Sequence, residues 1–444
     1  MIVLKFGGTS VGNATSIKKV VNIISSITTP KIVVLSAVSG TTNSLLEISN
    51  NILRNEKELA FQVLQKLHHS YINLIDELFS STKFRNRAKQ FIASKFNGIN
   101  TIIENNDTYN IEAIILAQGE ILSTNIVQLY LEETEIQSSL ISALDFMEID
   151  ENNEPNTEKL THQLFHLSRL DNKLWLTQGF ICKNINGEIS NLQRGGSDYT
   201  ASLIGAAVKA TEIQIWTDID GMHNNDPRYV DDTFSIEEVS FDEAAELAYF
   251  GAKILHPLSL IPAKENNIPV LLKNTFSPNA KGTIIKNDTV KNGITAIAAK
   301  DGITAIKIKS YRMLLAYGFL KKVFEVFEKY QTPIDMITTS EVAVSLTIDN
   351  TNSLDLIVKE LMPFGKIEID SNLSIICIAG DFSQNKEGIS ANVFNSIKDI
   401  PIRMISYGGS NYNTSLLVKT SDKTRALNAL NKGLFKENLA LIKV

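Results

Sequence analysis

The sequence contains little cysteine and little histidine. Its 444 residues include two cysteines, Cys182 and Cys377, and six histidines. The cysteines are far apart in apolar, strand-like runs, which argues against a disulfide framework and suits a reducing cytoplasm. We expect both to be small buried apolar side chains. The histidines form no spaced set of ligands, so we expect no metal centre built from protein side chains.

The chain also lacks an excess of positive charge and a long apolar run. It has 43 Lys and Arg against 49 Asp and Glu, a formal net charge of -6. This balance provides no electrostatic footprint for nucleic acid or for an anionic membrane. No apolar run is expected to span a bilayer, and the N-terminus enters a strand at Ile2 instead of a signal peptide. We therefore expect a cytoplasmic protein with no nucleic-acid or membrane partner.

A chain of 444 residues should divide into two or three domains. Up to about residue 290, short β-branched runs alternate with longer helical patterns, and residues 31–35, 174–177 and 213–216 are strand-like. This alternation predicts an α/β domain whose mostly parallel sheet is covered by helices on both faces. Leucine and isoleucine recur at helical spacing through residues 43–105, which predicts a helical layer followed by a strand over residues 111–116.

An internal repeat follows the α/β region. Its matching residues lie 68 to 70 positions apart, which predicts two copies of one small α+β unit. Each copy has the pattern strand, helix, strand, strand, and its helix begins near a glycine and ends before a proline. The matched pairs are Gly318 and Gly388, Val323 and Val393, Phe324 and Phe394, Pro333 and Pro401, Ile334 and Ile402, Met336 and Met404, Ile337 and Ile405, Ser345 and Ser415, and Leu346 and Leu416.

The first candidate site follows the opening strand, which runs directly into Lys5-Phe6-Gly7-Gly8-Thr9-Ser10. A glycine pair lets backbone N–H groups approach an anion, and the lysine adds a fixed positive charge. The lysine precedes the glycines, so this is not the Walker pattern G-x-x-x-x-G-K-[ST], which the chain lacks. A simple turn is the alternative, because most Gly-Gly pairs are turns.

A second glycine pair lies in Arg194-Gly195-Gly196-Ser197-Asp198-Tyr199-Thr200-Ala201, which leads into a helical pattern. Backbone donors, an arginine fork and a carboxylate at one helix N-terminus can hold a carboxylate or a phosphate together with a metal. The alternative is a loop in which Ser197 or Asp198 merely caps the helix.

Two further segments are polar where strands or helices end. Trp216-Thr217-Asp218-Ile219-Asp220-Gly221 precedes Asn225-Asp226-Pro227-Arg228 and ends a strand, which is where open α/β sheets bind ligands. A surface turn is the alternative. Tyr249-Phe250-Gly251-Ala252-Lys253-Ile254-Leu255-His256-Pro257 places Lys253 where it can pin a phosphate, and a snorkelling surface lysine is the alternative.

The fifth segment, Gln118-Gly119-Glu120-Ile121-Leu122-Ser123, places Glu120 at an expected strand-to-helix joint. There the carboxylate suits a ligand ammonium, and helix capping is the alternative. The sequence suggests no Ser-His-Asp or Cys-His constellation. These residues therefore favour phosphoryl transfer by electrostatics, without a protein nucleophile.

Taken in this order, the segments resemble the aspartate kinases of the amino acid kinase family, over essentially the whole chain. The resemblance implies a carbamate kinase-like α/β/α sandwich with a mostly parallel sheet over residues 1–290. It also implies two ferredoxin-like α+β ACT domains, one over residues 301–370 and one over residues 293–300 with 371–444. The segments that carry it are Lys5 to Val11, Arg194 to Thr200, Trp216 to Asp218, Asp226 to Arg228 and Phe250 to Pro257.

Within that family the chain is most similar to the monofunctional, lysine-sensitive type. Ile337-Thr338-Thr339-Ser340-Glu341 resembles the effector-binding strand of lysine-sensitive enzymes. The sequence has no G-x-G-x-x-G after a strand and stops at Val444, just after the second repeat. We therefore expect no appended homoserine dehydrogenase.

The resemblance implies transfer of the γ-phosphate of ATP to the β-carboxylate of L-aspartate, the first step toward lysine, threonine and methionine. A carboxylate is already a nucleophile at neutral pH, so no strong base is needed. Bringing two anions together calls for positive groups and for Mg²⁺, which would be held mainly by the nucleotide phosphates. The alternatives are another amino acid kinase, acting on glutamate or a nucleotide, and a catalytically silent amino-acid sensor.

Position by position, the resemblance implies three catalytic residues. Lys5 would neutralise the transferring phosphoryl group, Asp198 would organise the reacting centre, and Arg194 would grip the α-carboxylate of aspartate. The implied substrate-binding residues are Thr42, Glu120 on the ammonium, Phe180, Arg194, Gly195, Gly196 and Ser197. The implied nucleotide-binding residues are Lys5, Phe6, Gly7, Gly8, Thr217, Asp218, His223, Arg228, Lys253 and Ile254. His223 and Gln193 depart from the family pattern, which has tyrosine and glycine there.

The resemblance also places an L-lysine effector site at an ACT–ACT interface between two chains of a homodimer or larger homo-oligomer. The implied residues are Met313, Ala316, Phe319, Leu320, Pro333, Ile334, Asp335, Ser340 and Glu341, of which Asp335 and Glu341 would meet the lysine ammonium. Ala316 and Pro333 replace hydroxyl residues, so altered sensitivity is one alternative, and a purely structural dimer interface is another. We expect effector binding to tilt the regulatory pair and to disturb the phosphate and aspartate loops.

Overall fold

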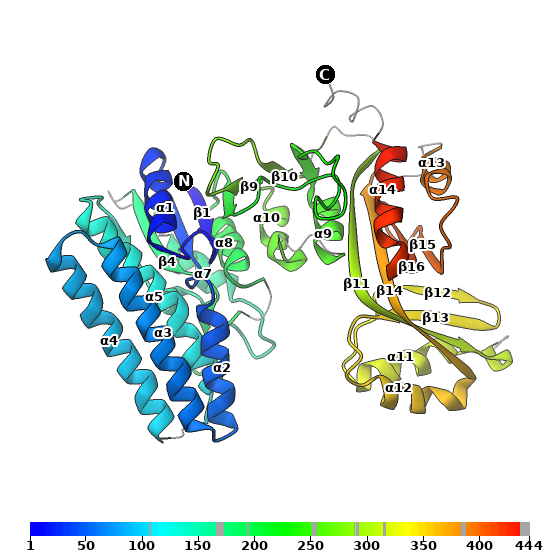
Figure 1. Cartoon of the computed structure of the whole chain (residues 1–444), viewed down its shortest axis with the longest axis horizontal. Coiled ribbons are helices and arrows are strands. Elements are labelled where there is room, and N and C mark those ends of the chain that lie inside the picture. Colours follow the sequence, from blue (N-terminus) through cyan, green and yellow to red (C-terminus); the bar gives the residue numbers. More distant parts are fainter. Residues whose placement is uncertain are drawn as a thin grey trace. The chain divides into compact units, whose positions relative to one another are not determined.

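The computed structural model describes residues 1–105, 108–165, 173–192, 195–250, 255–287, 289, 293–313, 317–382 and 388–435. The chain separates into two compact units (Figure 1). The first unit comprises Met1–Met222, Glu237–Phe241 and Leu255–Thr289, and the second comprises His223–Ile236, Asp242–Ile254 and Val290–Val444.

The first unit is built on an eight-stranded sheet of order β3-β4-β2-β1-β7-β9-β10-β8. Its neighbouring strands are parallel except at the β9–β10 pair, which confirms the predicted mostly parallel sheet. The strands are β1 (Ile2–Phe6), β2 (Lys31–Leu35), β3 (Ser139–Leu140), β4 (Leu174–Gln178), β7 (Ile213–Thr217), β8 (Glu238–Ser240), β9 (Val270–Asn274) and β10 (Thr283–Lys286). A separate hairpin pairs β5 (Ile181–Lys183) with β6 (Ile189–Asn191).

Both faces of this sheet are covered. Leu4, Val33 and Leu35 belong to one large apolar cluster with the helices of the first 130 residues or so, whereas the alternate residues Val3 and Val34 are equally buried outside that cluster. Helix α8 (Gly196–Ala207) packs against β1, β2 and β7. Consecutive buried β-branched residues are what a sheet covered on both sides requires.

The predicted helical layer is confirmed as a group of long helices (Figure 1). The helices of the first unit are α1 (Ala14–Ser26), α2 (Thr41–Leu53), α3 (Lys57–Leu78), α4 (Thr82–Asn105), α5 (Ile111–Glu133), α6 (Ala143–Phe146), α7 (Thr157–Leu164), α8 and α10 (Ile261–Glu265), with a short 3₁₀ turn at Pro257–Leu260. In α3 and α4 the buried apolar residues recur at helical spacing and line one stripe of each helix.

The prediction of a strand over residues 111–116 is wrong, because these residues form the first turns of α5. A fully buried helix shows no clear apolar stripe, so its sequence cannot be distinguished from a buried strand by periodicity. Glu120 consequently lies in the middle of a helix and not at a strand-to-helix joint. The expectation of no long apolar run also needs correction, since α5 is long and apolar enough to cross a membrane, although most of its apolar stretch is buried against other helices and against strands.

The second unit contains a six-stranded antiparallel sheet of order β12-β13-β11-β14-β16-β15. Its strands are β11 (Ile294–Lys309), β12 (Ile337–Ser340), β13 (Ala343–Ile348), β14 (Lys366–Gly380), β15 (Met404–Tyr407) and β16 (Asn413–Lys419). Its helices are α9 (Phe241–Tyr249, whose first residue belongs to the first unit), α11 (Phe319–Lys329), α12 (Leu354–Leu361), α13 (Ile389–Ser396) and α14 (Lys423–Leu434), with 3₁₀ turns at Tyr311–Met313, Met362–Phe364 and Thr420–Asp422.

The internal repeat is visible in this unit. Gly318 and Gly388 both stand at the N-cap of a helix with positive φ, +78° and +85°, a conformation that costs other residues steric energy. The long strands β11 and β14 pair along their whole length and serve both repeats, with a register shift between Lys300 and Ile303. Two separate apolar clusters, one for each repeat, fill the unit. Cys182 and Cys377 are both buried and unpaired, as predicted.

Candidate active site

Lys5 and Asp198 form the charged centre of the first unit. Lys5 Nζ lies 2.6 Å from Asp198 Oδ1, and the two side chains are only 12% and 15% exposed. Lys5 is near the end of β1, and Asp198 is in the first turn of α8, which Gly195 and Gly196 enter with φ of +70° and +51°. The N-cap of α8 is Gly195 and makes no side-chain cap bond. Asp198 therefore meets the lysine of the first glycine motif instead of capping the helix.

The first glycine pair follows β1 at the carboxyl end of the parallel strands, where α/β sheets bind ligands. The Gly7 N–H donates to the Trp216 carbonyl at 3.2 Å, so Gly7 links β1 to β7. Among the described residues no hydrogen bond occupies the Gly8 N–H. A Cβ at Gly8 would lie 3.0 Å from the Ala37 carbonyl oxygen, so a larger residue would crowd the turn. Phe6 stacks on Trp216 beside it, with 5.8 Å between ring centroids.

Glu120 brings a buried carboxylate to the same unit. Its Oε1 accepts the Ala37 N–H at 3.2 Å, while its Oε2 is buried with no partner among the described residues. Burial raises the pKa of Glu120 to about 7, against the lowering effects of the Ala37 N–H and the charge of Lys5. The Glu120 carboxylate therefore has one oxygen without a hydrogen-bond partner among the described residues and lies within the electrostatic influence of Lys5. Such a carboxylate is suited to bind a ligand ammonium.

Three serines join the elements around this carboxylate. Ser123 of α5 donates to the Ser36 carbonyl at 2.7 Å, and the Ser36 hydroxyl donates to the Ser197 hydroxyl at 2.9 Å. Ser36, Ala37 and Ser123 were not predicted as site residues. Their position in the sequence could have indicated a role for Ser36 and Ala37, because they directly follow the buried strand β2 and ligands bind at the carboxyl ends of such strands.

Gly179 and Phe180 shape the wall next to Ser197. A Cβ at Gly179 would lie 2.3 Å from Ser197 Oγ, so only glycine fits there. Phe180 is half-buried with φ of +66°, and its N–H donates to Thr200 Oγ1 at 2.9 Å. Thr42 is exposed in the first turn of α2.

The expected nucleotide residues are distributed over both units. Thr217 ends β7, and its hydroxyl donates to Asp218 Oδ1 at 3.1 Å. His223 and Arg228 belong to the second unit, where His223 Nδ1 lies 3.2 Å from Thr233 Oγ1. The Arg228 guanidinium forms a bidentate ion pair with the Asp226 carboxylate, in which Nη2 lies 2.6 Å from Oδ2. Gln193, Arg194, Lys253, Ile254 and the effector residue Ala316 lie outside the described residues.

The expected effector residues are in the first repeat. Asp335 Oδ1 accepts from Lys300 Nζ at 3.0 Å and from Tyr249 Oη at 2.9 Å, and its side chain is 1% exposed. Lys300 also pairs with Asp349 at 2.8 Å and lies 4.6 Å from the centroid of the Tyr249 ring. Burial, followed by the charge of Asp335, raises the pKa of Tyr249 to about 12.

The other expected effector residues are less enclosed. Pro333, Ser340 and Glu341 are exposed and Ile334 is half-buried, whereas Phe319, Leu320 and Met313 pack on the apolar cluster of the first repeat. A depression of ≈ 300 Å³ beside Asp335 is lined by Glu246, Tyr249, Ser410 and Asn413, among others.

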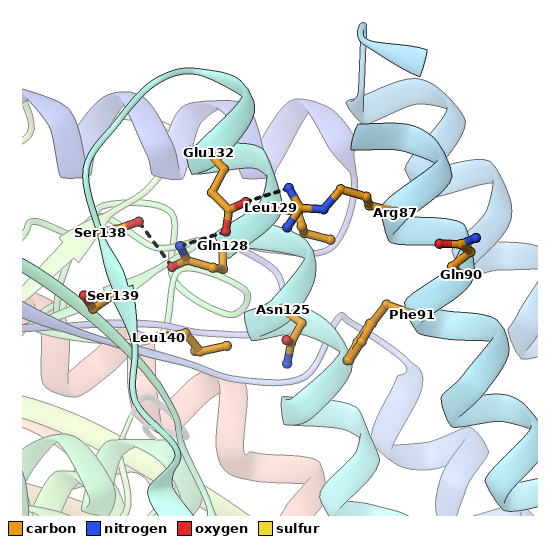
Figure 2. Close-up of a pocket in the computed structure, with 10 residues that line it drawn as sticks. All are labelled: Arg87, Gln90, Phe91, Asn125, Gln128, Leu129, Glu132, Ser138, Ser139 and Leu140. Atoms are coloured by element: carbon orange, nitrogen blue, oxygen red, sulfur yellow. Dashed lines mark hydrogen bonds and ion pairs between the residues drawn. The ribbon is translucent and has the colours of Figure 1, made fainter. Parts of the chain in front are cut away.

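A larger depression, of ≈ 660 Å³, lies elsewhere in the first unit between α4, α5 and residues 138–140 (Figure 2). Figure 2 shows the Arg87–Glu132 ion pair, at 2.9 Å, across this depression. None of Lys5, Asp198 and Glu120 lines this larger depression, so the depression is separate from the charged centre.

The chain is similar to known proteins over nearly its whole length. The model of the amino acid kinase family matches residues 1–274, and an ACT domain model matches residues 376–434. Lysine-sensitive aspartokinase 3 of Escherichia coli K12 is 32% identical, and the match covers 98% of this chain and 99% of that relative. The chain belongs to the aspartokinases of the amino acid kinase family.

Solved structures of aspartokinases have the same fold. E. coli aspartokinase III in complex with aspartate and ADP (R-state) matches with a TM-score of 0.85 at 31% identity, over 98% of this chain and 100% of that one. The complex of the same enzyme with lysine and aspartate (T-state) matches with a TM-score of 0.82 at 32% identity, over 98% and 99%. Aspartokinase 2, chloroplastic, of Arabidopsis thaliana is 33% identical over 98% of this chain and 84% of its own length.

Proposed function

We propose that the protein transfers the γ-phosphate of Mg-ATP to the β-carboxylate of L-aspartate, giving 4-phospho-L-aspartate and ADP. The observation that carries this proposal is the Lys5–Asp198 pair at the carboxyl edge of the parallel sheet, in one unit with the half-partnered carboxylate of Glu120. The aspartate and ADP bound by the E. coli relative support it. This reaction is the first step of lysine, threonine and methionine biosynthesis. We also propose a cytoplasmic location for the protein.

Lys5 neutralises charge on the phosphoryl group as it moves between two anions. The Gly8 N–H donates to the same group. Asp198 holds the Lys5 ammonium in place through their 2.6 Å contact and organises the reacting centre. The β-carboxylate of aspartate is ionised at neutral pH and attacks phosphorus without a protein base.

One carboxylate, Asp198, lies at the charged centre beside Lys5. A single carboxylate suits an Mg²⁺ ion that is held mainly by the nucleotide phosphates. Asp198 is the carboxylate that would face the metal, directly or through water. When bound, Mg²⁺ neutralises phosphate charge, and the protein side chains orient the two substrates.

Aspartate is oriented by charge at both of its ends. Glu120 Oε2 takes the ammonium, and Arg194 takes the α-carboxylate in a bidentate grip. Ser197, Gly195, Gly196 and Thr42 complete the pocket, and Phe180 forms a wall. The nucleotide is held by Phe6, Gly7, Thr217, Asp218, His223, Arg228, Lys253 and Ile254.

L-Lysine inhibits the enzyme from a site in the first repeat, in a homo-oligomer formed through the ACT domains. The lysine bound by the T-state relative supports this proposal. The site uses Asp335 and Glu341 for the lysine ammonium, with Met313, Ala316, Phe319, Leu320, Pro333, Ile334 and Ser340 around it. We assign residues 1–290 to the kinase domain, although residues 223–236 and 242–254 cluster with the second unit. Residues 301–370 form one ACT domain, and residues 293–300 with 371–444 form the other.

A coupled assay of ADP release tests the reaction. We expect turnover only when aspartate and Mg²⁺ are both present, and hydroxylamine should trap the acyl phosphate as a hydroxamate. Lys5→Ala and Asp198→Ala should abolish most of this turnover. Near wild-type rates in both variants would contradict the assigned roles, and lysine-dependent thermal stabilisation without any turnover would indicate a silent sensor instead.

A further inference from the structure

The loop of residues 223–236 contains two of the expected nucleotide-binding residues, His223 and Arg228. It nevertheless belongs to the second unit. Its backbone is attached to helix α14 of the second repeat. The Asn428 amide donates to the Tyr229 carbonyl at 2.9 Å, and the Asn431 amide donates to the Asp232 carbonyl at 2.8 Å. The loop is therefore held from a helix that lies nearly 200 residues further along the chain.

Asn431 is the hub of this attachment. Its Oδ1 accepts from Asn224 Nδ2 at 2.8 Å and lies 3.4 Å from Asn225 Nδ2, while the same Asn225 amide reaches the Leu427 carbonyl at 3.2 Å. Asn224, Asn225 and Asn431 are 0%, 2% and 1% exposed. Three side-chain amides so deeply buried are tolerated only because their donors and acceptors are satisfied by one another and by the backbone.

The network holds both ends of the loop of residues 223–236. Asn224 Oδ1 accepts the Phe234 N–H, and the Asn224 carbonyl accepts the Ile297 N–H of β11, each at 2.8 Å. Asn225 Oδ1 accepts the Asp226 N–H at 2.9 Å, and Asp226 in turn holds the Arg228 guanidinium. A chain of contacts therefore runs from Asn431 through Asn225 and Asp226 to Arg228. A fully satisfied buried network of this kind specifies one conformation.

We infer that Asn431 is a positioning residue for the nucleotide: through the buried amides of Asn224 and Asn225, the second repeat sets the loop that presents Arg228 to ATP. This inference rests on the proposed function, because it takes Arg228 as a nucleotide ligand. Asn431 itself touches no substrate. Its loss should weaken nucleotide binding and leave aspartate binding, which uses Glu120 and Ser197 of the first unit, unchanged.

The experiment compares two variants of the full-length protein with a matched control. Asn431→Leu removes the hydrogen-bonding groups of Asn431 and keeps a branched side chain of similar shape. Asn428→Ala removes an amide that donates to the Tyr229 and Thr424 carbonyls. Val393→Ala, in α13, shortens a residue of the apolar cluster that includes Leu427. Because a valine side chain has no hydrogen-bonding group, this variant controls for lost stability. Steady-state KM values for ATP and aspartate are measured with kcat, and Mg-ADP binding is measured by calorimetry.

We expect Asn431→Leu to raise the KM for ATP and the Kd for Mg-ADP about tenfold, the size of one lost contact to a charged group. Asn428→Ala should raise both about threefold, and neither variant should change the KM for aspartate more than about twofold. Val393→Ala should leave both KM values near wild type. An unchanged Kd for Mg-ADP, or equal changes for ATP and aspartate, would overturn the inference. If Asn431→Leu does not fold, Asn428→Ala decides.

Failure of the proposed function would look different. A wild-type protein without aspartate-dependent ADP release would refute the reaction, whereas the calorimetric comparison of Mg-ADP binding would still show whether Asn431 sets the nucleotide loop.

Discussion

The Nζ of Lys5, near the end of β1, lies 2.6 Å from Oδ1 of Asp198, in the first turn of α8, although the two residues are far apart in the sequence. The pair is mostly buried, so neither charge is well compensated by water. We expect Lys5→Met to lower kcat by about a hundredfold or more, the effect of removing one preorganised charge that stabilises a transition state. ADP release at saturating substrates measures this.

Asp198→Asn separates the electrostatic role from simple packing, because it keeps the shape of the side chain. We expect a similar loss of kcat, and the double variant should lose no more than the worse single variant, since the two residues act as a unit. Strictly additive losses would show that Lys5 and Asp198 act independently.

The Glu120 carboxyl predicts a pH dependence. Burial raises its pKa from 4.5 to about 7, so in the free enzyme it loses its charge as the pH falls through about 7. We expect kcat/KM for aspartate to fall over the same range, because a neutral carboxyl cannot pair with the ammonium. In Glu120→Gln this ratio should be low and should not show that pH dependence. A wild-type profile that is flat between pH 6 and pH 8 would contradict the assignment.

The same shift has a consequence for stability. Between the unfolded pKa of 4.5 and the folded pKa of about 7, the folded protein binds more protons than the unfolded chain. The contribution of Glu120 to stability is therefore fully present below pH 4.5 and is lost as the pH rises through about 7. At pH 8 we expect Glu120→Gln to be more stable than wild type, by at most on the order of 3 kcal/mol. Urea denaturation of both proteins at two pH values measures the difference.

Gly179 predicts a steric effect on substrate binding. A Cβ there would lie 2.3 Å from Ser197 Oγ and 2.8 Å from Ser197 Cα, so Gly179→Ala must displace the start of α8. We expect a rise in the KM for aspartate of about tenfold or more. Gly98→Ala is the matched control, since Gly98 is exposed on helix α4 and has open space around its Cα. It should raise stability by about 0.5–1 kcal/mol without changing kinetics.

The Tyr249 hydroxyl and Lys300 occupy one oxygen of Asp335, the residue that would receive the effector ammonium. Removing one of these donors should free the carboxylate. We expect Tyr249→Phe to lower the L-lysine concentration for half-inhibition about threefold, in line with one ordinary hydrogen bond. Lys309→Met, which breaks the exposed pair with Glu368 in the same sheet, should not change it. Equal half-inhibition in Tyr249→Phe and wild type would show that the Tyr249 hydroxyl does not compete with the effector for Asp335.

The sequence predicted the elements whose signals are local. The strands around the first glycine pair and the repeated glycine-to-helix starts follow from β-branched runs and from backbone conformations that only glycine adopts easily. The start of α5 was mistaken for a strand, because apolar residues lie on most sides of this largely buried helix and give no clear helical period. Ser36, Ala37 and Ser123 were missed because serine and alanine are common everywhere, and only the three-dimensional contact with Glu120 and Ser197 distinguishes them.

The attachment of residues 223–236 to α14 could not be predicted for a different reason. Asparagine in a polar loop is typical of a surface turn, and nothing in the loop indicates that its amides pair with a helix of the second repeat. The contact is a property of long-range topology, and the cost of closing such a large loop appears in no local pattern.

The two units are interleaved along the chain, and this constrains how such a protein can be recombined. Residues 223–236 fall within the stretch that matches the amino acid kinase family, yet Val230 is a 2% exposed member of the same apolar cluster as Leu427 and Leu416. A gene fusion that joined a foreign sensor after residue 290 would leave Val230 and the buried asparagines without their partners. Exchange of regulatory modules between relatives must therefore carry this loop and α9 along, so these inner segments should follow the ancestry of the sensor and not that of the surrounding kinase.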